Sequence, residues 1–79
     1  MKNEILDNIN IILKEKFGFK KKVHSQTNLY KQKNWDSLKH LDFIMLLEKN
    51  FKIKFNLQDD YQITLIKDFI TLVKKKFKK

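Results

Sequence analysis

The chain contains no proline and a single glycine among its 79 residues, so very little in it interrupts a helix. Its apolar residues recur at steps of three and four along three segments, the spacing that places side chains on one helix face. Residues 52–56 alternate apolar and basic side chains, but no second strand is available to pair with them. We therefore expect an all-α fold, with residues 52–56 as a linker.

Three main amphipathic helices and one short helical turn are predicted. The first helix covers residues 2–17 and ends before Gly18, because glycine suits the left-handed backbone that follows many helices. The second covers residues 36–51, a short turn is expected over residues 57–61, and Thr64 can cap the last helix. The expected apolar faces comprise Ile5, Ile9, Ile12, Leu13 and Phe17; Leu38, Leu41, Ile44, Met45, Leu47 and Phe51; and Ile66, Phe69, Ile70, Val73 and Phe77.

The remaining long segment, residues 19–35, is polar and lacks a sustained period, so we expect a long first loop. Leu29, Tyr30 and Trp35 are the side chains expected to pin it to the core. Residues 1–79 are short enough for one domain, and we expect a monomer. No apolar run approaches the roughly 20 residues of a membrane-spanning helix, which favours a cytoplasmic protein. The chain has no cysteine and no cluster of histidines with carboxylates, so no metal site is predicted.

The formal net charge of +9 raises the alternative of a basic helical module that binds nucleic acid or an acidic protein. All 18 cations are lysine, whereas base recognition and bidentate phosphate binding favour arginine. The lysines are also spread over every predicted element instead of one helix face. This distribution favours the interpretation that the lysines keep the surface solvated, and no nucleic-acid partner is expected.

Ser37 is the candidate functional residue because it follows a capping aspartate at the start of the second helix. The carboxylate of Asp36 can accept hydrogen bonds from the free N–H groups of the first turn. A phosphate attached to Ser37 would be stabilised by the same helix start, so the position suits a phosphoester or, as a minor alternative, a kinase target. No general base is placed beside a nucleophile, and we do not expect an enzyme.

The uninterrupted segment of residues 36–51 resembles the second helix of acyl carrier proteins. The matching features are the Asp36-Ser37-Leu38 attachment motif, the aliphatic positions after it, the Leu47-Glu48 pair and the closing Phe51. Other segments are also similar to the family: Thr27-Asn28-Leu29, Ile53-Lys54-Phe55, Asp59-Asp60 and Ile63-Thr64. The first helix matches the family only in the pattern of its apolar residues.

The resemblance implies a four-helix bundle, with three main helices, a short third helix and a long first loop. It also implies that coenzyme A supplies a 4'-phosphopantetheine arm to Ser37 and that this arm carries an acyl or aminoacyl group as a thioester. The implied partners are a phosphopantetheinyl transferase, a loading ligase, and a downstream transferase or synthase. The chain would carry its cargo and catalyse nothing itself.

Two features depart from the family. Asn34-Trp35 replaces the usual small pair before the motif, and Trp35 is expected to pack over the loop or lie beside the arm. The run Trp-Asp-Ser-Leu-x-His-Leu, residues 35–41, looks more like stand-alone carriers of specialised pathways. The partner-recognition helix of the family is usually acidic, but here cations interrupt its carboxylates. The residues concerned are Lys39, Asp42, Glu48 and Lys49.

His40 is three residues beyond Ser37 and one position off the expected buried face. A protonated His40 could touch the phosphate of the arm, but a solvent-exposed histidine without such a role is the favoured interpretation.

Overall fold

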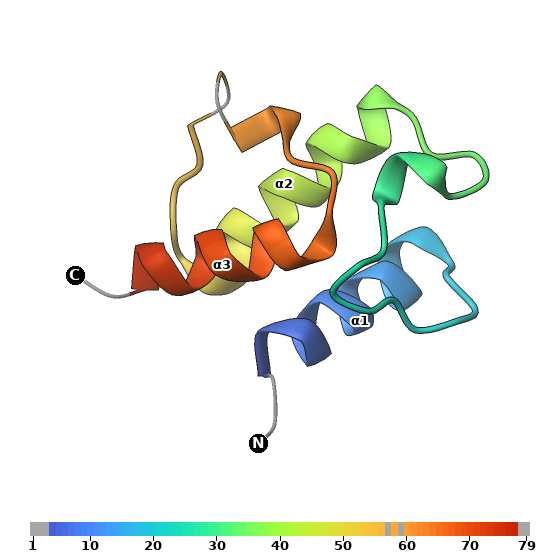
Figure 1. Cartoon of the computed structure of the whole chain (residues 1–79), viewed down its shortest axis with the longest axis horizontal. Helices are drawn as coiled ribbons and strands as arrows, with labels where there is room; N and C mark the ends of the chain where they lie inside the picture. The colour runs from blue at the N-terminus through green and yellow to red at the C-terminus, as the bar shows by residue number, and fades with distance from the viewer. Residues whose placement is uncertain (1–3, 57, 59, 78–79) are drawn as a thin grey trace.

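A computed structural model describes residues 4–56, 58 and 60–77, and in this part of the chain it contains three α-helices. Figure 1 shows them as α1 (Glu4–Phe17), α2 (Ser37–Phe51) and α3 (Ile66–Phe77), with two short 3-10 turns at Leu29–Lys31 and Asp60–Gln62. The described residues form no strand; one isolated bridge joins Asn28 to Leu65. The prediction of an all-α fold is confirmed, and residues 52–56 are a linker as expected.

Helix α1 has the predicted apolar face. Ile5, Ile9, Ile12 and Leu13 are buried in the core. The helix ends before Gly18, whose φ of 73° lies in the left-handed region that glycine adopts without strain. Its N–H donates to the carbonyl of Lys14 at 3.2 Å, so the end of α1 is closed by a backbone bond. Lys2, placed in this helix by the sequence pattern, lies outside the described residues.

Helix α2 has the predicted extent but buries a different face from the one expected. Ile44, Leu47 and Phe51 are buried as predicted, but Leu38 is 73% exposed and Met45 is 53% exposed. The core face is completed instead by two residues that were not predicted to lie there, His40 and Phe43, and Leu41 is half-buried. Apolar residues occur on almost every side of this helix, so their spacing alone could not determine which side faces the core.

The start of α3 is capped by the long loop, and the prediction of Thr64 as its N-cap is wrong. Leu65 is the residue before the helix, and the N–H groups of Ile66 and Lys67 donate to carbonyls of the loop. The acceptors are Thr27, at 2.9 Å from Ile66, and Ser25, at 2.7 Å from Lys67. Backbone carbonyls therefore satisfy the free donors that a capping side chain was expected to satisfy.

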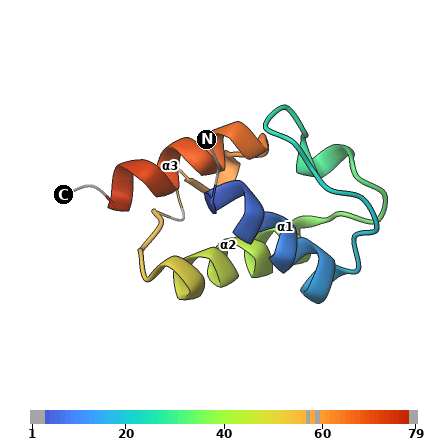
Figure 2. The ribbon, with the colours of Figure 1, turned by 90° about the horizontal axis from the view of Figure 1, so that it is seen from below.

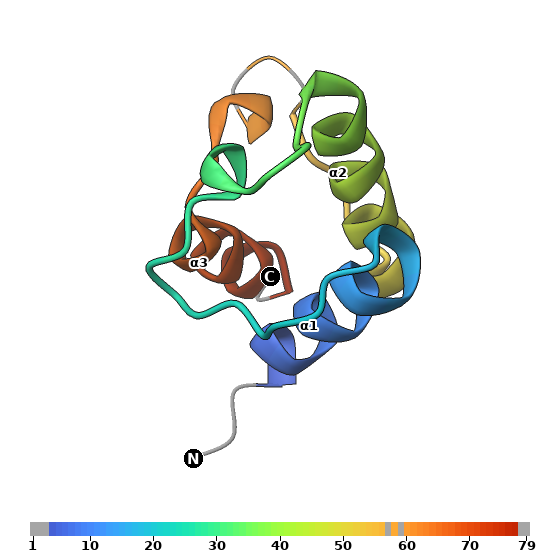
Figure 3. The same ribbon diagram turned by 90° about the vertical axis from the view of Figure 1, so that its right-hand side faces the viewer.

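The buried face of α3 agrees with the prediction. Its core residues are Ile66, Phe69, Ile70 and Val73; the side chain of Phe77 lies outside the described part of the structure. The rings of Phe43 and Phe69 meet edge to face with their centroids 5.2 Å apart, which joins α2 to α3. Figures 2 and 3 show the three helices arranged around this common core.

The long loop covers the end of the molecule where α1 ends and α2 begins (Figure 1). Val23, Leu29 and Trp35 are buried and anchor it, whereas Tyr30, expected as a third anchor with Leu29 and Trp35, is 42% exposed. The Asn10 side chain holds the loop to α1, accepting from the Val23 N–H at 2.7 Å and donating to the Val23 carbonyl at 3.3 Å.

The short turn between α2 and α3 is shifted from its predicted position at residues 57–61. It forms at Asp60–Gln62; residues 57 and 59 lie outside the described part. Asp60 is buried at this turn. Its carboxylate accepts from the N–H of Asn56 at 2.7 Å and pairs with Lys76 at 3.7 Å, and these contacts compensate for its burial. None of the described helices is both long enough and apolar enough to cross a membrane.

Candidate functional site: the exposed serine at the start of helix α2

Ser37 is the first residue of α2 and its side chain is exposed to solvent. Asp36 caps the helix as predicted, because its Oδ1 accepts from the N–H of Lys39 at 3.0 Å. The cap fixes the direction in which the chain enters the helix. Ser37 therefore presents a primary hydroxyl on the outside of the molecule, at the positive end of the helix dipole.

Two further hydrogen bonds hold the backbone on either side of this serine. The hydroxyl of Tyr61 donates to the carbonyl of Ser37 at 2.9 Å, and Nζ of Lys39 donates to the carbonyl of Asn34 at 2.6 Å. Asn34 has a left-handed backbone, with φ of 68°, which turns the loop into the helix. Tyr61 was not predicted at the site because it lies 24 residues from Ser37 and no sequence motif links the two.

His40 is fully buried, so the expectation of an exposed histidine is wrong. Its ring is surrounded by aromatic rings from the loop, the second 3-10 turn and α3, which comprise Tyr30, Trp35, Tyr61 and Phe69. The indole N–H of Trp35 donates to Nδ1 of His40 at 3.2 Å. Trp35, 8% exposed, packs in the core, which is the first of the two roles expected for it.

The hydrogen bonds of His40 determine its tautomer. Because an indole N–H can only donate, Nδ1 must be the acceptor and Nε2 must carry the hydrogen. Nε2 then donates to the carbonyl of Ile63 at 2.8 Å. Burial lowers the pKa of His40 from its ordinary value. With both ring nitrogens engaged inside the protein, His40 is part of the support for α2 and does not face a group attached to Ser37.

Partial burial of its side chain, together with the neighbouring hydroxyl of Tyr61, raises the pKa of Tyr30. Tyr30 is therefore neutral beside the histidine at ordinary pH.

The four residues expected on a partner-recognition face are not equivalent in the structure. Asp42 and Lys49 are exposed. Glu48 is half-buried and its Oε2 accepts from the N–H of Phe55 at 2.7 Å, so this carboxylate holds the linker to α2. The ammonium group of Lys39 is likewise bound to the Asn34 carbonyl. Two of the four charges therefore have structural partners, and two point outward.

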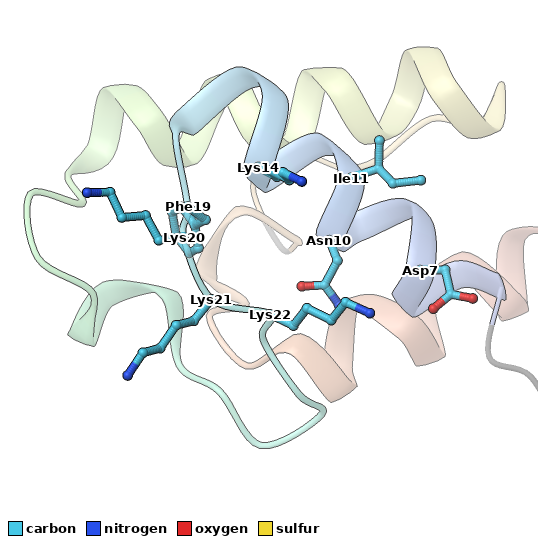
Figure 4. A pocket seen from close by; sticks show the side chains of 8 residues that line it. All are labelled: Asp7, Asn10, Ile11, Lys14, Phe19, Lys20, Lys21 and Lys22. Carbon is cyan, nitrogen blue, oxygen red and sulfur yellow. The ribbon is translucent and has the colours of Figure 1, made fainter.

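The lysines at residues 20–22 border a hollow between the loop and α1 (Figure 4). Their ammonium groups do not converge: Lys20 and Lys21 extend away from Lys22, which lies beside Asn10. A compact anion needs donors that converge on it. The three ammonium groups therefore do not form an anion site, and their arrangement is typical of solvated surface lysines. Among the described residues, no three histidine, aspartate or glutamate side chains gather as metal ligands.

The geometry around Ser37 suits a hydroxyl that receives a group from an external enzyme. Ser37 is exposed, hydrogen bonds hold the backbone around it, and the nearest histidine along α2 has both nitrogens engaged. No model of a known protein family matches the chain, and no curated protein matches it.

Proposed function

We propose that this protein is a carrier of the acyl carrier type and that Ser37 is the attachment point of its 4'-phosphopantetheine arm. The observation that carries the proposal is the position of Ser37: exposed, at the first residue of α2, directly after a capping Asp36. The segment that starts there is also the segment whose sequence resembles the attachment helix of acyl carrier proteins.

The residues around Ser37 fit a phosphopantetheine group. The hydroxyl is accessible to a transferase, and the neighbouring Leu38 is 73% exposed, so an arm has room to leave the surface. The first turn of α2 provides a favourable field for the phosphate. When bound, the arm supplies a terminal thiol that holds an acyl or aminoacyl group as a thioester.

The rest of the chain has a supporting role in this proposal. Tyr61 and Lys39 fix the backbone around Ser37, so a partner enzyme meets the hydroxyl in one orientation. The turn at Asp60–Gln62 would correspond to the short third helix of a four-helix carrier bundle, with α3 as its fourth helix. The chain would carry its cargo between a loading ligase and a downstream transferase or synthase, without catalysing a reaction itself.

The experiment is transfer of phosphopantetheine from coenzyme A by a broad-specificity phosphopantetheinyl transferase, followed by intact mass. We expect one added phosphopantetheinyl group on the wild-type protein and none on Ser37→Ala. The matched control is Ser25→Ala, which removes an exposed serine from the long loop and should leave the addition unchanged.

Loss of the addition in both variants would point to a folding defect, which circular dichroism would reveal. Addition to Ser37→Ala, or no addition to any folded form of the protein by transferases that differ in the charge of their docking surface, would contradict the proposal.

A further inference from the structure

The outer face of α2 places exposed apolar side chains next to Ser37. We call the exposed positions Leu38, Asp42, Met45 and Lys49 the α2 outer face; their spacing of four, three and four residues places them on one side of the helix. Leu38 and Met45 are two of the four large apolar side chains that the described part of the chain leaves exposed. Exposed apolar side chains grouped beside a modification site are typical of a docking surface.

The charges around this face are mostly positive. Met45 borders two open hollows, of about 340 and 530 Å³. Their cationic lining residues are Lys16, Lys49, Lys52 and Lys54, and their only carboxylates are those of Asp42 and Glu48. Four lysines therefore line these hollows against two carboxylates, of which Asp42 is exposed and Glu48 is half-buried.

We infer that the enzyme that docks on Ser37 binds the α2 outer face through an acidic surface with an apolar recess for Leu38 and Met45. Like charges opposed across an interface disfavour binding, so a basic docking surface would meet Lys49 and its neighbours unfavourably. The two exposed apolar side chains favour a protein over a nucleic acid, whose backbone would use the lysines but not Leu38 and Met45. This inference rests on the proposed function of Ser37.

Charge reversal in two matched pairs of lysines tests the inference. The docking variant is Lys49→Glu with Lys54→Glu, beside Met45. The control variant is Lys67→Glu with Lys74→Glu, both exposed on α3, whose buried face packs in the core. The two variants have the same net charge, and each changes one lysine in the last turn of a helix, Lys49 in α2 and Lys74 in α3, so the general effect of net charge is matched.

The measurement is the rate of phosphopantetheine transfer by a transferase whose carrier-facing surface is basic, at low and high salt. We expect the docking variant to be modified about tenfold faster than wild type at low salt, equivalent to about 1.4 kcal/mol, with the gain lost at high salt. The control variant should remain within about twofold of wild type, because surface pairs away from an interface contribute little.

The outcomes separate the inference from the function on which it rests. Equal acceleration of both variants would show that net charge alone matters, and a docking variant no faster than wild type would show that α2 does not meet the enzyme in this way; either result overturns the inference while Ser37 is still modified. No modification of wild type or either folded variant would overturn the inference together with the proposed function.

Discussion

Trp35 and His40 form a buried side-chain pair in which the indole N–H donates to Nδ1 of the imidazole at 3.2 Å. The pair joins the last residues of the long loop to the first turn of α2, immediately behind Ser37. The opposite nitrogen of His40 extends the link to Ile63, just before α3. The position of the candidate attachment site thus depends on contacts among the loop, α2 and the segment that leads to α3.

Removing the indole donor should destabilise the protein. In Trp35→Phe, Nδ1 of the buried His40 loses its partner, which costs about 1–3 kcal/mol, and the smaller ring also weakens packing. Urea unfolding followed by far-ultraviolet circular dichroism measures the change in free energy of unfolding. An unchanged free energy of unfolding would show that the bond contributes nothing to stability.

Acid should weaken the fold through His40. Burial lowers the pKa of the folded-state imidazole below its ordinary value of 6.5, so the unfolded chain binds the proton more tightly. The free energy of unfolding should therefore fall as pH decreases below about 6.5, by at most about 1.4 kcal/mol per pH unit for one proton, until the folded-state pKa is reached. The rings that face His40 belong to Tyr30, Trp35, Tyr61 and Phe69. The pKa of Tyr30 is raised above its ordinary value of 10.0, so Tyr30 is neutral in this range.

Two histidine variants assign this pH dependence. His40→Gln should remove most of the slope between pH 5 and 7 that is expected for one buried imidazole. His24→Gln, in the exposed part of the loop, should retain it. A slope that persists in His40→Gln would assign the pH dependence to other groups.

Asp36→Ala should lower the free energy of unfolding by about 0.5–2 kcal/mol, because the N–H of Lys39 loses its capping acceptor. Asp42→Ala is the control, since it removes an exposed carboxylate farther along the same helix and should change stability by no more than about 0.5 kcal/mol. Thermal and urea unfolding of both variants provide the comparison. Equal effects would mean that total charge, and not the cap, determines the result.

The carboxylate of Glu48 should contribute to the free energy of unfolding, because one of its oxygens accepts a hydrogen bond from the linker. Glu48→Ala leaves the N–H of Phe55 without the carboxylate, and a hydrogen bond to a charged group contributes about 1.5–3 kcal/mol. Glu48→Gln keeps an acceptor at the same position and should recover most of this loss. Urea unfolding of the two variants measures the difference; equal destabilisation would show that the amide oxygen cannot replace the carboxylate.

Features determined by neighbouring residues were predictable from the sequence. The extent of α2, its Asp36 cap and the end of α1 at Gly18 each depend on a few consecutive residues, and all three agree with the structure. The exposure of Ser37 follows from the same local pattern. The buried faces of α1 and α3 were predictable because each has one clear apolar side.

Features that depend on distant contacts were not predictable in the same way. His40 is buried because Trp35 and the carbonyl of Ile63 satisfy its nitrogens, and the latter is 23 residues away. The outward direction of Leu38 and Met45 depends on which of several apolar sides of α2 packs against the other helices. No local pattern contains this information.

The capping of α3 by the long loop has a consequence for how the protein opens. The N–H groups of Ile66 and Lys67 are bonded to carbonyls about 40 residues earlier in the chain, and the N–H of Leu29 donates in return to the carbonyl of Thr64. These amides exchange with solvent only when the loop separates from the helix. Their hydrogen-exchange rates therefore report loop detachment directly, and a common opening free energy for the amides of Leu29, Ile66 and Lys67 would identify loop and helix start as one cooperative unit.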